Sequence, residues 1–289
     1  MRSLLFVPAD GGAKLDKGFT SGADAVILDL EDSITPERKD IARKAALDFL
    51  KGASGKKERP RLLVRINGLD TGMTDADLDA VVPGAPDAIM FPKAEGGATV
   101  AHLDAKLTAR EAVAGLAEGS IKILAQTVET ALGVFTAGSY RDSSARLIGM
   151  TWGPEDLSAE IGAQANRDES GVLTEAYRIA RAVCLLGATA AKVPAYETIH
   201  VDFRNLEGLR RDTQEARRDG FAGRLAIHPA QVAVINEVFT PNAADIEKAK
   251  AIVAAFAAKP GAGTVGIEGK MYDRPHLARA QRLLAGIKS

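Results

Sequence analysis

The chain has 289 residues, of which 46% are hydrophobic and 26% are charged. A chain of this length buries roughly three quarters of its unfolded surface, so it needs no disulfide or metal to fold. The 37 Lys and Arg against 38 Asp and Glu give a net charge of −1, which argues against a general binder of nucleic acid or membrane surfaces. The single cysteine, Cys184, excludes an internal disulfide framework and favours a reducing compartment.

The N-terminus carries a short apolar run, Leu4–Val7, behind Arg2. Pro8 and Asp10 end this run too early for the core of a signal peptide. No stretch approaches the 18 or so apolar residues that a membrane span needs. We therefore expect a buried strand here and a cytoplasmic protein.

The chain contains eight short runs of apolar residues. Within each run the apolar residues follow one another instead of alternating with polar ones, which is the pattern of parallel strands buried on both faces. They are Leu4–Val7, Ala25–Leu28, Leu62–Ile66, Ala88–Phe91, Ile121–Ala125, Leu147–Met150, Ala190–Val193 and Leu225–Ile227.

Helical patterns separate the runs. Thr35-Pro36-Glu37 is a helix start that predicts a helix to about Leu50. Further helices are predicted over Ser170–Leu186, Val201–Gly220 and Pro229–Val238. Strands and helices in this order predict a (β/α)8 TIM barrel, with a doubly wound open sheet as the alternative.

The last residues do not form a ninth unit of the barrel. Ala243–Ala258 and Arg274–Ile287 read as helices, and Lys259–Lys270 reads as a glycine-rich loop. We predict a catalytic domain over residues 1–240 and a C-terminal helical extension over 241–289. The extension could cap its own barrel or reach a neighbouring subunit.

The polar residues that end the apolar runs are the candidates for chemistry, because a barrel's active site lies at the carboxyl ends of its strands. Along the chain they are Asp29, Glu31, Asp32, Arg65, Asn67, Lys93, Gln126, Glu129, Glu155, Asp156 and His228. Carboxylates and a few cations therefore converge on one mouth.

Glu129 and Asp156 each follow a strand, one βα unit apart, with no Cys or His cluster nearby. Such hard oxygen donors favour Mg²⁺ or Mn²⁺ over zinc. The alternative is that both acids only complement helix N-termini.

Arg65 ends a very apolar strand, where a buried guanidinium needs a partner. Asp29 could be that partner, or Arg65 could hold a substrate carboxylate or enolate oxygen. Lys93 could form a Schiff base, but the metal carboxylates make that unnecessary. His102, His200 and His276 receive no role, and Cys184 is expected in the core.

Seven stretches of this sequence, taken together, resemble the citrate lyase β-subunit-like group of the HpcH/HpaI aldolase family, which includes malyl-CoA lyases. They run in family order through 2–8, 24–32, 64–67, 128–130, 153–157, 226–231 and 269–275. The sequence departs from the family pattern at two places. Tyr272 stands where some lyases have an aliphatic residue, and the fifth strand ends in Gln126-Thr-Val-Glu129 rather than in the common Ile-Glu-Thr form.

The resemblance implies a Mg²⁺-dependent enzyme, with Mn²⁺ possible, that assembles as trimers or hexamers. Glu129 and Asp156 match the metal ligands, and Arg65 matches the arginine that binds substrate. Positions that line the substrate and CoA site are matched by Lys17, Asp29, Glu31, Asp32, Ile227 and His228. Asp273 matches a C-terminal lid aspartate that in several members enters the neighbouring subunit's site.

The implied reaction is a reversible Claisen-type cleavage of a 3-hydroxyacyl-CoA, of malyl-, citramalyl- or citryl-CoA type, to acetyl-CoA and a 2-oxo acid. Arg65 would stabilise the enolate and Asp273 would move the proton. The alternatives are a citrate lyase β subunit acting on an acyl-carrier-protein thioester, a malyl-CoA thioesterase, and a metal-dependent pyruvate aldolase.

Overall fold

The structure is a computed structural model and describes residues 1–287. It divides into two compact units, Met1–Phe239 and Thr240–Ser289, which are described separately below. None of the described helices is long and apolar enough to cross a membrane.

The first unit is a parallel barrel, which confirms the predicted (β/α)8 fold. Its sheet has the order β6-β5-β4-β3-β2-β1-β8-β7, and a parallel bridge between Met150 and Ala195 joins the two outer strands. The strands are β1 (Ser3–Pro8), β2 (Ala25–Asp29), β3 (Arg61–Arg65), β4 (Ala88–Phe91), β5 (Lys122–Gln126), β6 (Leu147–Thr151), β7 (Tyr196–Glu197) and β8 (Gly223–Ala226).

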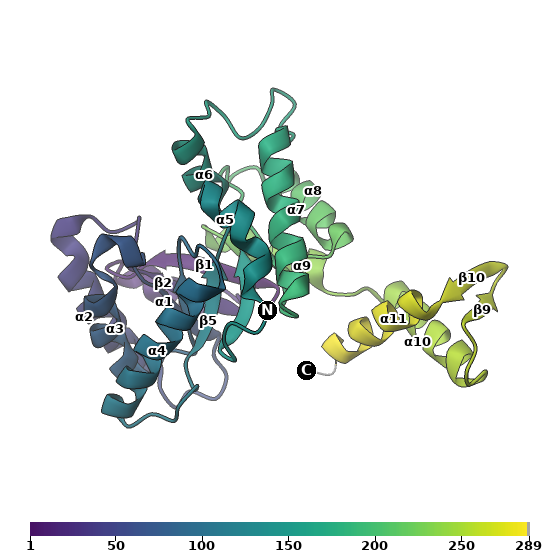
Figure 1. Cartoon of the computed structure of the whole chain (residues 1–289), viewed down its shortest axis with the longest axis horizontal. Helices are drawn as coiled ribbons and strands as arrows, with labels where there is room; N and C mark the ends of the chain where they lie inside the picture. The colour runs from purple at the N-terminus through teal and green to yellow at the C-terminus, as the bar shows by residue number, and fades with distance from the viewer. Residues whose placement is uncertain (288–289) are drawn as a thin grey trace. The chain divides into compact units, whose positions relative to one another are not determined.

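Helices cover the outside of this barrel (Figure 1). The α-helices are α1 (Ala13–Phe19), α2 (Lys39–Ala53), α3 (Thr74–Val81), α4 (Gly97–Ala114), α5 (Ala131–Thr136), α6 (Pro154–Ile161), α7 (Glu175–Ala190), α8 (Leu206–Asp219) and α9 (Pro229–Phe239). Short 3-10 helices are η1 (Pro36–Arg38), η2 (Leu69–Thr71), η3 (Val82–Gly84) and η4 (Ala137–Tyr140).

The strands read as continuous apolar runs because both of their faces are buried. Leu4, Leu63 and Leu225 pack with other inward residues in one cluster that fills the barrel. Their neighbours Leu5 and Val64 belong to a second cluster between the strands and the helices. This double burial is the property that makes a parallel strand recognisable in sequence.

The predicted seventh strand, Ala190–Val193, is wrong. Ala190 ends α7, Lys192 takes a positive φ of 61°, and pairing with the barrel begins only at Ala195. A short apolar run suits the end of a helix as well as a strand, and periodicity does not distinguish the two.

The buried face of helix α7 also differs from the predicted one. In the helix predicted over Ser170–Leu186, the apolar residues at helical spacing would be expected to face the core, but Ile179 and Leu186 face outward, 51% and 67% exposed. The buried face of α7 instead carries Tyr177 and Cys184, so the core position expected for Cys184 is confirmed.

The second unit pairs two helices with a hairpin. Helix α10 (Ala243–Ala257) and helix α11 (Arg274–Ile287) are joined by strands β9 (Thr264–Ile267) and β10 (Lys270–Asp273). Ile252, Phe256 and Val265 contribute to a separate small core. The extension predicted from residue 241 onwards thus has a core of its own.

The hairpin corrects the loop predicted over Lys259–Lys270. Glu268 and Gly269 form the turn with φ of 49° and 74°, the positive values that two-residue hairpin turns of type I′ require. Glu-Gly is not a favoured turn pair, so the sequence carried only a weak signal for these strands.

A buried ion pair stabilises the barrel at the end opposite the mouth. Arg146, just before β6, contacts Glu111 of α4 at 2.7 Å, and both side chains are almost fully buried. Glu111 also accepts hydrogen bonds from the backbone N–H of Gly119 and Ile121. Burial alone would raise the pKa of Glu111, but the Arg146 hydrogen bond and these backbone donors lower it to about 2.

We predict that Glu111→Gln lowers the free energy of unfolding by about 3 kcal/mol at pH 7, because it removes the buried one of the two carboxylates that pair with Arg146 and leaves only Asp104. The folded pKa lies below the unfolded value of 4.5, so the difference between wild type and variant is complete above pH 5. It shrinks as the pH falls towards 2.

Urea unfolding followed by circular dichroism across this pH range measures the difference. The control is Glu175→Gln, which removes an exposed ion pair to Arg178 and should cost less than about 1 kcal/mol. An equal loss in both variants would contradict the structural role of Glu111.

Candidate active site

The last residues of β2 and β3 form a buried ion pair at the mouth of the barrel. Asp29 and Arg65 are paired in the register of the two strands. Arg65 donates to both carboxylate oxygens of Asp29, from Nε at 2.7 Å and from Nη2 at 2.8 Å. Burial alone would raise the pKa of Asp29, but these hydrogen bonds hold it below its usual value. Asp29 is therefore an anion that orients Arg65.

Arg65 has a second carboxylate partner and an aromatic support. Its Nη1 lies 2.8 Å from Oε2 of Glu31, and its guanidinium sits 4.8 Å from the ring centroid of Phe6. Hydrogen bonds to Asp29 thus engage Nε and Nη2 of Arg65, whereas Nη1 makes an ion-pair contact with Glu31.

Lys93 links the acids of three strands. Its Nζ lies 2.6 Å from Oε1 of Glu31 and 3.3 Å from Oδ1 of Asp156. Its backbone N–H donates to Oε2 of Glu129 at 2.7 Å. Lys93 achieves this with a φ of 48°, a left-handed conformation that is strained for a residue with a side chain.

The electrostatics of Glu31 and Lys93 follow from this arrangement. Burial raises the pKa of Glu31 to about 7, although Arg65 and Lys93 both act to lower it. Burial also acts to lower the pKa of Lys93, but the hydrogen bond to Glu31 and the nearby acids raise it. Lys93 therefore stays a cation, while Glu31 titrates near neutral pH.

Glu129 is a buried carboxylate, with 1% of the residue exposed. Burial and the neighbouring Asp156 raise its pKa well above the ordinary value. It accepts hydrogen bonds from Gln126 and the backbone of Lys93, but no cationic side chain of residues 1–287 forms an ion pair with it. Gly153 lies so close that an added Cβ would stand 2.5 Å from Oε1 of Glu129.

This site fits a hard divalent cation. Among the described residues Glu129 has no ionic partner, Asp156 is partly exposed, and both offer carboxylate oxygens as ligands. No group of three or more His, Cys, Asp or Glu gathers as a metal site in the described part of the chain. Two protein carboxylates with water and substrate oxygens completing the shell suit Mg²⁺, which keeps several of its waters.

A second layer of buried polar groups fixes the loop after β2, and sequence reasoning missed most of it. Lys39 Nζ donates to the carbonyls of Leu30 and Glu31 at 2.7 and 2.8 Å and to Asn67 Oδ1 at 2.8 Å. Asp77 accepts from the backbone and side chain of Asn67. Asn67 at a strand end was the one available signal, because Lys39 and Asp77 lie inside helices.

The other sequence candidates contribute little to these contacts. Asp32 is exposed, and its carboxylate stands 3.7 Å from Arg65. Lys17 is exposed on α1 and forms no ion pair with the mouth acids. Ile227 and His228 follow β8, where their backbone N–H groups donate to Gln231 and the His228 ring stacks on Phe203.

Asp273 belongs to the second unit, at the end of β10. Its carboxylate contacts Nδ1 of His276 and accepts from the His276 backbone N–H at 3.3 Å. The hydrogen bond from His276 lowers the pKa of Asp273. The aspartate is therefore ionised at neutral pH, and its side chain is 39% exposed.

Comparisons with known proteins bear on what this site does. The family model described as HpcH/HpaI aldolase/citrate lyase matches residues 2–229. Citrate lyase subunit beta of Leuconostoc mesenteroides subsp. cremoris is 34% identical over 286 residues, which are 98% of this chain and 92% of the relative. A (3S)-malyl-CoA thioesterase of Cereibacter sphaeroides is also 34% identical, covering 98% of this chain and 93% of the relative.

A solved structure resembles the chain over its full length. The protein CitE of Mycobacterium tuberculosis, in complex with magnesium, acetoacetate and coenzyme A, has a TM-score of 0.79 and 31% identity. The match covers 100% of this chain and 98% of CitE. The resemblance seen in the sequence motifs is confirmed: the chain is an enzyme of the lyase class and belongs to the HpcH/HpaI aldolase/citrate lyase family.

Proposed function

We propose that this chain is a Mg²⁺-dependent lyase that cleaves and forms the C–C bond of a 3-hydroxyacyl-CoA thioester. The products of cleavage are acetyl-CoA, or a similar acyl-CoA, and a 2-oxo acid. The observation that carries the proposal is the pair Glu129 and Asp156 beside an oriented Arg65, joined through Lys93. Malyl-, citramalyl- and citryl-CoA are the substrate types in view.

The proposed cofactors are supported by the comparisons and by the donor set. The similar CitE structures contain magnesium with acetoacetate, with pyruvate or with oxaloacetate, and one also contains coenzyme A. A bound Mg²⁺ would supply a Lewis acid that polarises the carbonyl of the 2-oxo acid. Glu129 and Asp156 would hold it, and Mn²⁺ would serve in its place.

Arg65 would bind the oxygen that becomes negative in the reaction. Asp29 fixes its guanidinium in a bidentate fork, so the guanidinium needs no reorganisation when the thioester enolate forms. Donors set in advance stabilise the transition state more than the substrate. Asp29, Glu31 and Asp32 are thus placed to orient the group that touches substrate.

Asp273 would move the proton on the acetyl carbon, as the acid in cleavage and the base in condensation. The contact with His276 keeps it ionised, which suits a base. We propose that it acts on a neighbouring subunit of a trimer or hexamer, because the second unit has its own core and could exchange as a block. Lys17, Ile227 and His228 would line the CoA path, in a cytoplasmic enzyme.

The similarity to two relatives supports alternatives to the proposed lyase function. The thioesterase similarity favours hydrolysis of the CoA ester after condensation. The citrate lyase β similarity favours an acyl-carrier-protein thioester as substrate. A metal-dependent pyruvate aldolase acting on free aldehydes is the least supported alternative.

We predict that Mg²⁺ with acetyl-CoA and one of glyoxylate, pyruvate or oxaloacetate yields a condensation product, detected by mass spectrometry, and that EDTA abolishes it. Asp156→Asn should lower the rate by roughly a hundredfold or more, because it removes the negative charge of one of the two proposed ligands of Mg²⁺. Free CoA appearing after the product would reveal hydrolysis.

The matched control is Glu155→Gln, which neutralises the adjacent, exposed acid and should keep near-wild-type activity. The absence of any product from all three oxo acids would reject a free-standing CoA-ester lyase. Activity with an acyl-carrier-protein thioester alone would then support the β-subunit alternative.

We also predict that Asp273→Ala abolishes turnover but still binds glyoxylate, because the barrel's ligands are intact. Mixing Asp273→Ala with Asp156→Asn chains should restore activity, since roughly a quarter of sites would then combine an intact barrel with an intact neighbouring tail. The measurement is the turnover of refolded mixtures against each variant alone.

Lys270→Gln, on the same strand, serves as the control for damage to the hairpin and should leave turnover unchanged. Inactive mixtures of well-assembled chains would contradict action across subunits. Full activity of Asp273→Ala would contradict any role for this aspartate.

A further inference from the structure

Lys93 lies among the acids of the proposed metal site, although no step of the proposed reaction uses it. Its Nζ donates to Oε1 of Glu31 at 2.6 Å and lies 3.3 Å from Oδ1 of Asp156. Its backbone N–H donates to Oε2 of Glu129 at 2.7 Å. A single cationic residue therefore contacts both proposed ligands of Mg²⁺.

The backbone of Lys93 indicates that its side chain has a function here. Its φ of 48° lies in the left-handed region, where glycine would be less strained than any residue with a side chain. The same conformation directs the N–H to Glu129 and the ammonium to Glu31 and Asp156. Strain of this kind is typical of functional sites, where the surrounding structure maintains it.

The two contacts of the ammonium differ in distance and in burial. Glu31 is the closer partner, and its side chain is 6% exposed, whereas Asp156 is farther away and 29% exposed. Water and salt screen the more exposed charge more strongly. The contact with Asp156 is therefore the weaker one, and Lys93 can leave Asp156 while it keeps its hydrogen bond to Glu31.

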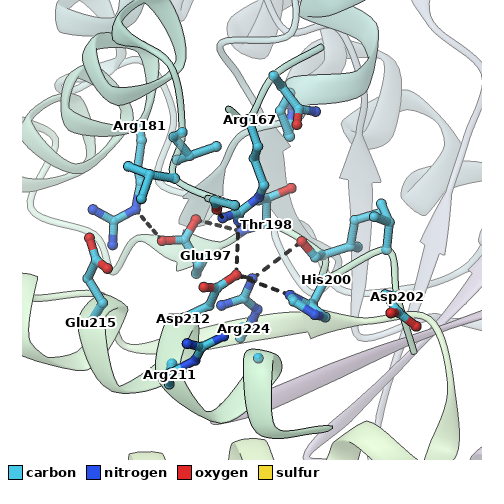
Figure 2. A pocket seen from close by; sticks show the side chains of 18 of the residues that line it. Arg167, Arg181, Glu197, Thr198, His200, Asp202, Arg211, Asp212, Glu215 and Arg224 are labelled. Atoms are coloured by element: carbon cyan, nitrogen blue, oxygen red, sulfur yellow. Dashed lines mark hydrogen bonds and ion pairs between the residues drawn. The ribbon is translucent and has the colours of Figure 1, made fainter. Parts of the chain in front are cut away.

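Another cluster of charges shows the opposite balance. Asp212 lines a cavity of about 570 Å³ beside β7 and β8, where its Oδ2 accepts from Arg167 at 2.9 Å and lies 3.1 Å from Nδ1 of His200. Nη2 of Arg224 lies 3.9 Å from the same oxygen. Figure 2 shows these side chains around Asp212. This carboxylate has several nitrogen partners, so a further cation has little to gain there.

The mouth of the barrel has fewer cations for its acids. Asp156 shares one ammonium with Glu31, and Glu129 forms no ion pair with any side chain of residues 1–287. A divalent ion bound to Asp156 would be a like charge beside the Lys93 ammonium. Like charges a few ångströms apart repel each other, so the ion and the ammonium weaken each other's contact with this carboxylate.

We propose that Lys93 is a positioning residue that competes with the divalent cation for Asp156 and thereby sets the affinity of the metal site, while Glu31 retains the ammonium. The inference rests on the proposed function for the identity of the metal ligands. In the absence of the ion, the ammonium reduces the repulsion between Glu31 and Asp156 and so stabilises the mouth of the barrel.

The test measures metal binding by the full chain without any substrate. After EDTA treatment and removal of the chelator, Mn²⁺ is added, and the free ion is measured by electron paramagnetic resonance. Lys93→Met keeps the length of the side chain and removes its charge, so it should bind Mn²⁺ at least about tenfold more tightly than the wild type.

Thermal unfolding gives a second measurement that does not depend on activity. In EDTA, Lys93→Met should melt at a lower temperature than the wild type, because Glu31 and Asp156 lose the cation that they share. Saturating Mn²⁺ should raise its melting temperature by more than that of the wild type, since an ion that binds more tightly stabilises the folded state more.

A double-variant cycle tests the part of Glu31. Glu31→Gln leaves Asp156 as the only carboxylate partner of the ammonium, so it should weaken Mn²⁺ binding in the wild-type background. In the Lys93→Met background the same substitution should have a smaller effect, because no ammonium competes for Asp156.

The matched control is Arg167→Met, which removes the cation of an ion pair of similar exposure. The side chains of Arg167 and Asp212 are 32% and 24% exposed, against 28% and 29% for Lys93 and Asp156. This variant should leave the Mn²⁺ affinity unchanged. Should Lys93→Met fail to fold, Lys93→Asn replaces it, because asparagine is neutral and tolerates a left-handed φ.

Mn²⁺ affinity in the Lys93 variant that is equal to or weaker than in the wild type would overturn the inference and leave the metal site and the proposed function intact. An equal gain in Arg167→Met would also overturn it. The absence of Mn²⁺ binding from the wild type and all variants would reject both the inference and the proposed function.

Discussion

The bidentate pair between Asp29 and Arg65 is the interaction on which the mouth of the barrel depends. It places a fixed cation where β2 and β3 end and draws Glu31 against it. Glu31 in turn holds Lys93, and Lys93 holds Asp156 and Glu129. Acids from three strand ends can therefore lie together because the two cations Arg65 and Lys93 lie between them. Glu129 is left without an ionic partner within residues 1–287 and is suited to a metal.

The sequence predicted the members of this cluster better than their contacts. Strands buried on both faces are visible as apolar runs, and their last residues must share one edge, so Asp29, Arg65 and Glu129 could be named in advance. The role of Lys93 could not, because it depends on a φ of 48° that residue types do not reveal. Lys39 could not either, since it reaches the site from inside a helix.

The errors have the same origin as the successes. Ala190–Val193 looks like a strand because local pattern does not say where α7 ends, and the missed hairpin turns through Glu268 at a φ of 49°. The net charge of −1 is likewise an average over the chain and does not reveal the acidic site at Glu129 and Asp156.

The most direct test of the account is the location of Mn²⁺ in crystals of the protein, by anomalous scattering, with glyoxylate present. The account predicts one ion bound by carboxylate oxygens of both Glu129 and Asp156, with Lys93 withdrawn from Asp156 and still on Glu31. An empty Glu129 site with Lys93 still on Asp156, or an ion bound elsewhere on the barrel, would contradict it.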